Sequence, residues 1–364
     1  MPEGNPRALG GGATPLREDR TEVGPAPTNA AETSLQQVRH WVCQPRASDA
    51  ASLPRRLRAI RRSAFVLFDC LAATAAVAAI PEIAPTRVLP VDGPTHFQPS
   101  GLALDQGALF TISDKHSEAI YRLDVQADRV LAVVARPIRL PEKNLFLDLE
   151  GIVADGAGGF YLVSEEYARV VFVPRDGPSS WVTDDLRPIG RPLGLLVKYN
   201  ATFEGIALLG PRHFLLAAER DARGVIEADF AVTPPKIVAT RIDESSLPYS
   251  GKRHPDFADL SVWHGRVFAL LRNACGVCEL VRDPVAGGAW REGEVAVRFP
   301  SIETDPRTQY RDMTYGLAEG LALDDTHLYL VLDNNDDTLA ADPKDNRSRL
   351  LIFANPFAPP VAAP

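Results

Sequence analysis

Several motifs that mark familiar enzymes are missing from this chain. It has no G-x-S-x-G segment, no H-E-x-x-H segment, no G-x-x-x-x-G-K-[ST] loop and no dinucleotide-binding glycine pattern. The glycine cluster Gly156–Gly159 lies between two apolar runs, where it predicts a hairpin turn. These absences argue against a hydrolase that uses a Ser-His-Asp triad.

An excess of basic residues is also missing. The chain carries 39 lysines and arginines against 47 aspartates and glutamates, a net charge of -8. Proteins that bind nucleic acid need a basic face to neutralise phosphates, so this balance argues against that class of partner. We expect a small molecule or a cation as the partner, and no nucleic acid.

Cysteine is scarce, and only Cys275 and Cys278 lie in the second half of the chain. In an oxidising compartment this close pair predicts a local disulfide. A redox motif would need a βαβ context, and a zinc site would need a second pair of ligands. The sequence favours neither of these two alternatives.

The N-terminal part of the chain separates into two segments. Residues 1–54 are rich in Pro, Gly, Ala and charge, which predicts a disordered extension. Residues 55–79 combine an arginine-rich start, an apolar stretch and the small residues Ala76–Ala78, the order of a secretory signal peptide. A membrane anchor or a buried helix is the alternative, but the apolar stretch contains Asp69 and is shorter than the roughly 20 residues that a span needs.

A signal peptide that begins near residue 55 lies far from Met1, and Met313 is the only other methionine. We therefore hypothesise that translation naturally starts at a non-Met codon near Val42 or Leu53. Cleavage near Ala79 would leave a periplasmic or secreted protein, with residues 80–360 as its domain and no stable membrane span.

Internal repetition is the strongest feature after residue 95. Five copies begin with a polar residue and continue through a short apolar segment, a turn and a second apolar run. Their starts are 50 to 60 residues apart, at Ser100, Glu150, Glu204, Asp259 and Glu319. Two apolar runs separated by a glycine-rich turn are typical of a β-hairpin, and a third run follows in each copy.

Repeated antiparallel hairpins with no convincing helix predict an all-β fold, a β-propeller of five or six blades. Residues 289–299 are the candidate for a sixth blade. Residues 87–91 are expected to complete the last blade, because closure of the ring removes exposed sheet edges.

The polar residues recur with a fixed offset inside each copy. The start residue and the residue that ends the second run are 14 or 15 positions apart, so a hairpin brings them to the same end. If the first strands are innermost, these side chains converge on one mouth of a central channel and predict a site for Ca²⁺ or Mg²⁺. The candidate metal ligands are Asp114, Glu150, Glu165, Glu204, Glu219, Asp259, Asn273, Glu319 and Asp333.

An alternative assigns these carboxylates to blade packing. In that case they accept hydrogen bonds from the backbone of neighbouring blades and from Lys115, Arg220 and Arg272. The histidines divide by the same register. His116 and His254 lie near the acidic end and are candidates for a catalytic general base, or else are ordinary loop histidines.

The segment Asn200–Ala207 and its continuation Ala218–Gly224 resemble the bacterial propellers known as phytase-like esterases and SdiA-regulated proteins. Asp148–Ile152, Ala318–Ala322 and Leu332–Asn335 match the same style of motif. The resemblance covers about residues 95–355 and implies an extracytoplasmic propeller. A more distant similarity is to gluconolactonases and paraoxonases, and implies that channel calcium is held by Glu150, Glu204, Asn273, Glu319 and Asp333.

Together these observations predict a monomeric, metal-dependent hydrolase of small esters, lactones or phosphoesters in the cell envelope. The alternative is a non-catalytic propeller that binds a ligand, a glycan or a protein. Metal content distinguishes the two.

Overall fold

The computed structural model describes residues 79–249, 254–313 and 317–359. The predicted disordered extension and nearly all of the predicted signal peptide lie outside the described residues, so both stay predictions. Across the described ranges, no helix combines the length and the apolar character needed to span a membrane.

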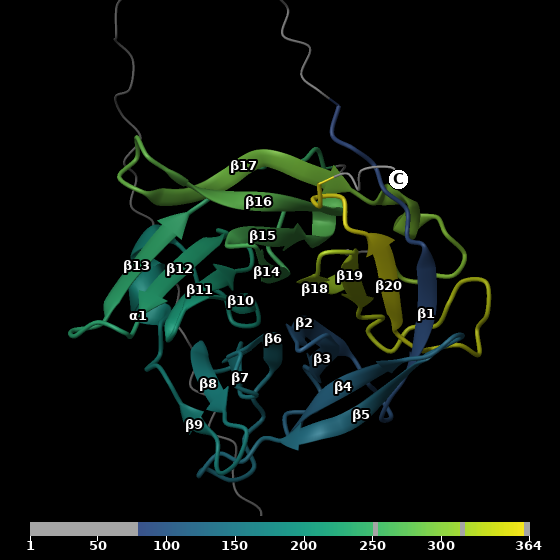
Figure 1. The fold of residues 1–364 in the computed structure, drawn as a ribbon, viewed down its shortest axis with the longest axis horizontal. Coiled ribbons are helices and arrows are strands. Elements are labelled where there is room, and N and C mark those ends of the chain that lie inside the picture. The colour runs from purple at the N-terminus through teal and green to yellow at the C-terminus, as the bar shows by residue number, and fades with distance from the viewer. Residues whose placement is uncertain (1–78, 250–253, 314–316, 360–364) are drawn as a thin grey trace, which may run out of the picture. The chain divides into compact units, whose positions relative to one another are not determined.

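The described residues form twenty β-strands, arranged as five four-stranded units that we call blades (Figure 1). Blade 1 contains β2 (Pro99–Asp105), β3 (Ala108–Ser113), β4 (Ala119–Val125) and β5 (Val130–Pro137). Blade 2 contains β6 (Leu149–Ala154), β7 (Phe160–Ser164), β8 (Arg169–Val173) and β9 (Ser180–Trp181). Blade 3 contains β10 (Phe203–Gly210), β11 (His213–Ala218), β12 (Gly224–Asp229) and β13 (Lys236–Arg241). Blade 4 contains β14 (Asp259–Trp263), β15 (Arg266–Leu271), β16 (Gly276–Asp283) and β17 (Ala289–Arg298). Blade 5 contains β18 (Ala318–Leu323), β19 (His327–Leu332), β20 (Arg349–Ala354) and β1 (Arg87–Asp92).

The first strand of each blade lies nearest the central axis in Figure 1, and the last lies at the perimeter. The five inner strands contact one another in a closed cycle, from β2 through β6, β10, β14 and β18 back to β2. The predicted all-β propeller class is therefore confirmed. The predicted second and third apolar runs coincide with the second and third strands of the blades.

The ring closes through the N-terminal strand of the domain. Residues 87–90 of β1 pair antiparallel with residues 349–352 of β20, so β1 supplies the outer strand of blade 5, as predicted. At its other end β1 pairs in parallel with β5, which joins blades 5 and 1 into one eight-stranded sheet. Residues 289–298 form the outer strand of blade 4.

Helical structure among the described residues is limited to four short segments in the loops. They are α1 (Arg187–Gly190), η1 (Arg191–Leu193), η2 (Arg272–Ala274) and η3 (Pro300–Glu303). The η2 turn directly follows β15 of blade 4 and carries Arg272.

The core consists of apolar side chains between neighbouring blades. Between blades 2 and 3, for example, Val163 and Val170 pack with Phe203, Phe214 and Leu216, and all five are almost completely buried. Each blade is thus fixed against the next by a separate hydrophobic layer. This packing holds the inner strands, and the residues at their ends, in defined positions.

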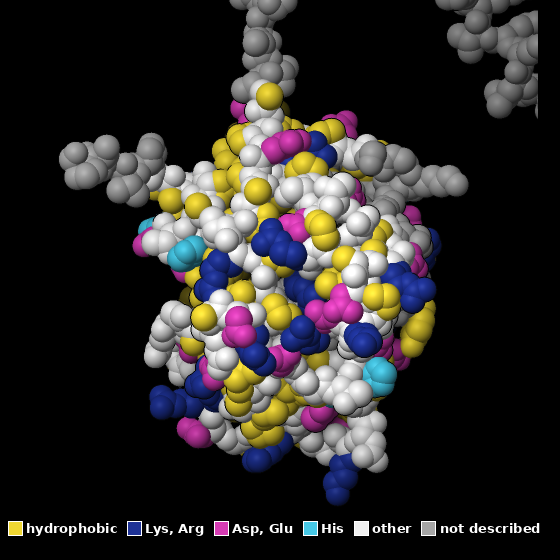
Figure 2. Space-filling view, turned by 90° about the vertical axis from the view of Figure 1, so that its right-hand side faces the viewer, with side chains coloured by type: hydrophobic (Ala, Val, Ile, Leu, Met, Phe, Trp, Pro, Cys, Tyr) yellow, Lys and Arg dark blue, Asp and Glu magenta, His cyan; other side chains and the backbone are white. Residues whose placement is uncertain are grey.

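Figure 2 shows the side of the domain on which β20, β1 and β5 lie, where acidic and basic side chains alternate over the surface. Ion pairs connect the segments that meet where β1 joins blades 5 and 1. Arg129 of the β4–β5 turn and Arg347, which precedes β20, both contact Asp92 at the end of β1. These pairs reinforce the closure of the ring, although exposed ion pairs contribute little individually.

The predicted disulfide is wrong in this structure. Cys275 and Cys278 are both buried thiols. Cys278 lies in β16 and packs on the blade 3 side of the sheet, whereas Cys275 belongs to the apolar cluster on the blade 5 side. Cys275 ends the η2 turn just before β16, and its thiol lies on the opposite side of the blade 4 sheet from that of Cys278, so the two sulfur atoms do not form a bond despite their short separation in sequence.

Candidate functional site: an acidic mouth built by bulged inner strands

Three predicted site residues occupy β-bulges at the start of inner strands. In blade 2, Leu149 pairs with Ser164 and Gly151 with Val163, which leaves Glu150 as the extra residue. Glu204 in β10 and Glu319 in β18 are extra residues of the same kind. A bulge changes the direction of a side chain relative to the pleat, so it provides a local cause for the placement of these carboxylates.

A glycine follows each bulged glutamate because neighbouring inner strands approach closely there. A Cβ atom on Gly205 would lie 2.7 Å from the backbone of Asp259 and Leu260 in β14. One on Gly151 would lie 2.9 Å from the carbonyl oxygen of Glu204. The Glu-Gly pair therefore combines an acidic side chain at the mouth with a strand contact that only glycine permits.

The carboxylates form two groups, each spanning two blades. The first acidic group is Asp114, Asp148 and Glu150, and the second acidic group is Glu165, Glu204 and Glu219. Within each group, one oxygen atom of every residue lies within 4.8 Å of the others. In each group, a carboxylate that follows the second strand of one blade lies close to a carboxylate at the start of the next blade's inner strand. The carboxylates therefore meet across neighbouring blades as well as within one blade.

An arginine whose side chain is only 11% exposed, Arg272, lies beside the second acidic group. Arg272 places Nε 2.8 Å from Asp256 Oδ2, Nη2 2.5 Å from Glu219 Oε1 and 3.8 Å from Glu204 Oε1. Its Nη1 pairs with Glu319. Arg220 pairs with Glu219 as well. The guanidinium groups of Arg220 and Arg272 therefore offset part of the negative charge of the second acidic group.

Asp259 takes a different role from the bulged glutamates. Its Oδ2 accepts the backbone N–H groups of Leu321 at 2.7 Å and Leu102 at 3.1 Å, and its Oδ1 accepts that of Leu260 at 2.8 Å. The residue is completely buried, and its strand starts without a bulge. This matches the predicted alternative in which a carboxylate connects neighbouring blades through their backbone.

The first acidic group has less positive charge beside it. Lys115 pairs with Asp114 Oδ2, whereas Oδ1 of the same carboxylate is buried without a hydrogen-bond partner. Asp333 lies close by, and its Oδ1 accepts the backbone N–H of Asn335 at 2.8 Å. An unpartnered buried carboxylate oxygen is a natural ligand for a cation.

The electrostatics of the mouth follow from burial. Burial is the largest cause that raises the pKa of Glu204, Glu319 and Asp333 to about 8, and Arg272 only partly offsets it for the two glutamates. The pKa of Asp148 rises to about 6, because of burial and then the charge of Asp114. Burial and the neighbouring carboxylates also raise the pKa of Glu150 well above its usual range.

The acidic side chains outnumber the basic ones around this mouth. Those described above are nine carboxylates: Asp114, Asp148, Glu150, Glu165, Glu204, Glu219, Asp256, Glu319 and Asp333. The basic side chains paired with them are Lys115, Arg220 and Arg272. The remaining negative charge has to be reduced by bound protons or by a cation.

The other predicted site residues lie around this mouth. His116 contacts Glu118 Oε1 at 3.2 Å and the carbonyl oxygen of Thr95 at 3.0 Å. Asn273 donates its side-chain amide to the carbonyl oxygen of His254 at 3.2 Å. Neither histidine belongs to the two acidic groups. Their proposed role as a general base stays a prediction.

Sequence reasoning did not single out two residues that the structure brings into the mouth. Asp148 lies two positions before Glu150, and Asp256 lies three positions before Asp259. Both precede an inner strand, so they fall outside the offset that identified the other carboxylates. Both could have been found in the sequence as acidic residues that lie two or three positions before the start residue of a repeat.

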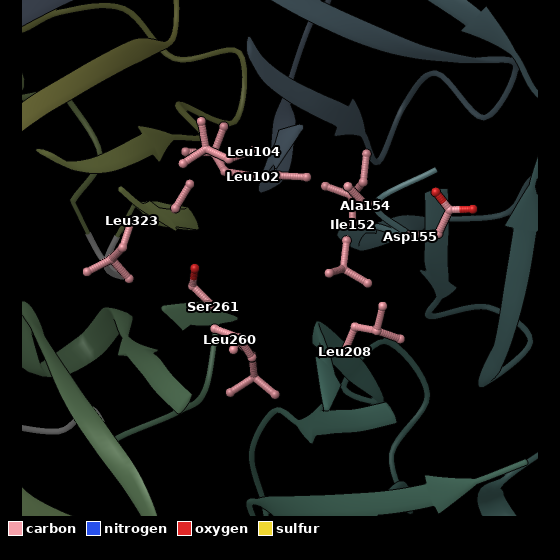
Figure 3. Close-up of a pocket in the computed structure, with 14 residues that line it drawn as sticks. Leu102, Leu104, Ile152, Ala154, Asp155, Leu208, Leu260, Ser261 and Leu323 are labelled. Atoms are coloured by element: carbon pink, nitrogen blue, oxygen red, sulfur yellow. The ribbon is translucent and has the colours of Figure 1, made fainter. Parts of the chain in front are cut away.

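The opposite end of the channel is lined mainly by aliphatic side chains. A pocket of about 290 Å³ lies there, and residues of all five inner strands surround it (Figure 3). Leucine and isoleucine side chains dominate its lining, and Ser261 and Asp155 contribute oxygen atoms. The two ends of the channel thus differ in their number of charged side chains, since Asp155 is the one charged residue among the described residues that line this pocket.

Comparisons with solved structures give remote similarities. Glutaminyl cyclase of Myxococcus xanthus aligns with 11% identity and a TM-score of 0.43, over 75% of this chain and 99% of that one. The PQQ-bound aldose sugar dehydrogenase of Streptomyces coelicolor aligns with 14% identity and a TM-score of 0.38, over 76% and 99%. Virginiamycin B lyase of Staphylococcus aureus aligns with 12% identity and a TM-score of 0.35, over 76% and 74%.

No curated protein matches the sequence. A family model does match, over residues 98–246, and its description is "Phytase-like: Esterase-like activity of phytase". The matched segment begins one residue before β2 and extends past β13, so it covers blades 1 to 3 with Glu150 and Glu204. The phytase-like family resemblance predicted from the Glu-Gly motifs is confirmed over this part of the chain.

Proposed function

We propose that this protein is a hydrolase of small esters, lactones or phosphoesters, and that its acidic mouth holds a divalent cation at the first acidic group. The observation that carries this proposal is the arrangement of Asp114, Asp148 and Glu150, whose oxygens converge with one ammonium group beside them. The family match supports an esterase-like activity.

The donor atoms fit a hard cation. Carboxylate oxygens suit Ca²⁺ or Mg²⁺, and the unpartnered Oδ1 atom of Asp114 provides one ligand. The second acidic group also has a buried oxygen without a hydrogen-bond partner, Glu219 Oε2, but it fits a cation less well because Arg272 and Arg220 already pair with Glu219. When bound, the cation would polarise a carbonyl or phosphoryl oxygen and activate water.

The neighbouring side chains have complementary roles in this proposal. Lys115 holds Asp114 in place and offers a positive charge to an anionic substrate. Glu165 accepts the backbone N–H of Thr202 at 2.9 Å and interacts with Asp148, so it orients the first acidic group from blade 2. The substrate would be a small molecule, reached by a monomeric protein in the periplasm or outside the cell.

One observation favours a second candidate function. The contacts of Arg272 and Asp259 connect the inner ends of several blades, as structural residues of a propeller do. A non-catalytic propeller that binds a ligand, a glycan or a protein would need the acidic mouth only for this packing.

Metal analysis followed by an activity panel tests the proposal. Purified protein is dialysed against chelator, reloaded with Ca²⁺ or Mg²⁺, and assayed on aryl esters, lactones and phosphomonoesters. We expect hydrolysis in the reloaded sample and its loss in Asp148→Asn. Absence of a bound cation together with absence of turnover on all three substrates would favour the non-catalytic candidate.

A further inference from the structure

A second pocket lies beside the acidic mouth, in the loops of blades 3 and 4. It has a volume of about 560 Å³, and Val197, Asp221, Arg241, Asp243, Tyr249 and His254 contribute to its lining. We call it the side pocket. This volume falls within the range of known small-molecule sites.

Two short chain segments connect the side pocket to the mouth. Glu219 belongs to the second acidic group, and Asp221 lines the pocket only two residues later. Asp256 pairs with Arg272, and His254 lines the pocket two residues earlier. The backbone N–H of Phe257 donates to the carbonyl oxygen of Glu219 at 3.2 Å and ties the two segments together. A ligand in the side pocket would therefore lie next to the acidic mouth.

The charged side chains of the side pocket compensate one another. Arg241 Nε lies 2.7 Å and 2.8 Å from the two carboxylate oxygens of Asp243. Lys198 pairs with Asp221. Because each charge has a partner within the protein, the pocket offers no net charge to an ionic ligand. It still offers exposed oxygen acceptors and guanidinium donors, since these side chains are about half exposed.

Flat side chains form the other part of the wall. The rings of Tyr249 and His254 have their centroids 6.4 Å apart and are inclined at 44°. Val197 and Tyr249 are both exposed, at 55% and 46%. Aromatic surface of this kind covers the apolar face of a ring-shaped ligand, while polar groups at the edge satisfy its hydrogen-bonding atoms.

We propose that the side pocket binds a saccharide ring. A pyranose is uncharged, presents hydroxyl groups at its edge and C–H groups on its face, and so matches paired charges combined with aromatic walls. This site is separate from the first acidic group and does not require the protein to be a hydrolase. If the protein is one, the side pocket would hold the sugar part of its substrate.

Binding is tested on the full-length protein by saturation-transfer NMR and calorimetry with glucose, maltose, cellobiose and N-acetylglucosamine as probes. We expect millimolar binding of at least one probe. Tyr249→Ala and Asp243→Ala should each weaken it about fivefold or more, whereas Tyr249→Phe, which keeps the ring, should retain it. Melting curves of the variants verify that these surface changes leave the fold intact.

Two controls separate this site from the rest of the molecule. Glu150→Gln, in the first acidic group, should leave saccharide binding unchanged even if it abolishes hydrolysis. Glucose 6-phosphate should bind no more tightly than glucose. The proposal is overturned if no probe binds, if Tyr249→Ala and Asp243→Ala bind as the unaltered protein does, or if the phosphorylated sugar is strongly preferred.

Discussion

Asp259 Oδ2 accepts the backbone N–H of Leu321 at 2.7 Å, which connects the inner strand of blade 4 to that of blade 5. The same oxygen also accepts the N–H of Leu102 in blade 1. One buried carboxylate therefore links three of the five blades at the axis. The predicted metal-ligand role of Asp259 has to compete with three backbone hydrogen bonds that already use both of its oxygens.

Asp259→Ala should destabilise the domain strongly. It leaves three buried N–H groups without an acceptor, and each costs about 1–3 kcal/mol. Asp259→Asn keeps one acceptor oxygen and should have an intermediate effect. Urea unfolding of the three proteins measures the order, and equal stability of the alanine and asparagine variants would contradict the assigned role.

Arg272→Met should lower the free energy of unfolding by about 3–5 kcal/mol, because it removes the partner of several buried carboxylates. The loss should be largest above about pH 8, where Glu204 and Glu319 are also ionised, and smaller near pH 5. Arg266→Met is the matched control, because Arg266 of β15 forms a partly exposed pair with Glu279 of the neighbouring strand β16. Similar losses for both variants would show that Arg272 has no special role.

Chelator-treated protein should lose stability as the pH rises from about 5 to about 8. Glu204 and Glu319 have a pKa raised to about 8 in the folded protein, so the folded state keeps protons that the unfolded state releases above about pH 4.5. The free energy of unfolding therefore falls with rising pH across this window. Melting temperatures between pH 5 and pH 9 measure it, and Glu319→Gln should flatten the curve.

Addition of Ca²⁺ or Mg²⁺ should raise the melting temperature of the chelator-treated protein, because a ligand that binds only the folded state stabilises it by mass action. Asp148→Asn should reduce this increase. Asp155→Asn, at the opposite end of the channel, changes charge by the same amount and should preserve the response. A cation response that both variants share would place the binding site elsewhere.

Gly205→Ala should be far more harmful than Gly210→Ala, although both glycines belong to β10. The added methyl group on Gly205 would meet the backbone of β14 at 2.7 Å, whereas on Gly210 its nearest contact would be the Cβ atom of His213 at 3.8 Å. Overpacking of this kind costs about 1–3 kcal/mol or more. Denaturant midpoints of the two variants provide the comparison.

The hairpins were predictable because their apolar runs and turns are local features. The apolar runs Phe160–Val163 and Phe214–Ala217 predict second strands, and the observed strands β7 (Phe160–Ser164) and β11 (His213–Ala218) are longer by one and two residues. The outer strands were harder to predict. Strand β13 contains no fully buried residue, and β9 has only two residues, so neither has a strong apolar pattern.

The candidate site was predictable only in part. The offset of 14 or 15 residues identified Glu150, Glu165, Glu204 and Glu219 because it reflects the hairpin geometry that brings them together. Arg272 lies among carboxylates of three blades, and these are brought together only by the closed ring. A pattern within one repeat cannot predict such a contact. The disulfide prediction failed because spacing alone does not indicate that Cys275 and Cys278 lie on opposite sides of a sheet.

The closure of the ring by β1 has a consequence for how the domain forms. Arg87 and Ile352 are partners in one ladder although the rest of the domain lies between them in the sequence. The last blade therefore cannot be completed until β20 (Arg349–Ala354) has left the ribosome. Early blades must wait as an open array with exposed strand edges, a state prone to aggregation. A chaperone that shields those edges would raise the yield of native protein, and a chain truncated before β20 would leave β1 without its antiparallel partner.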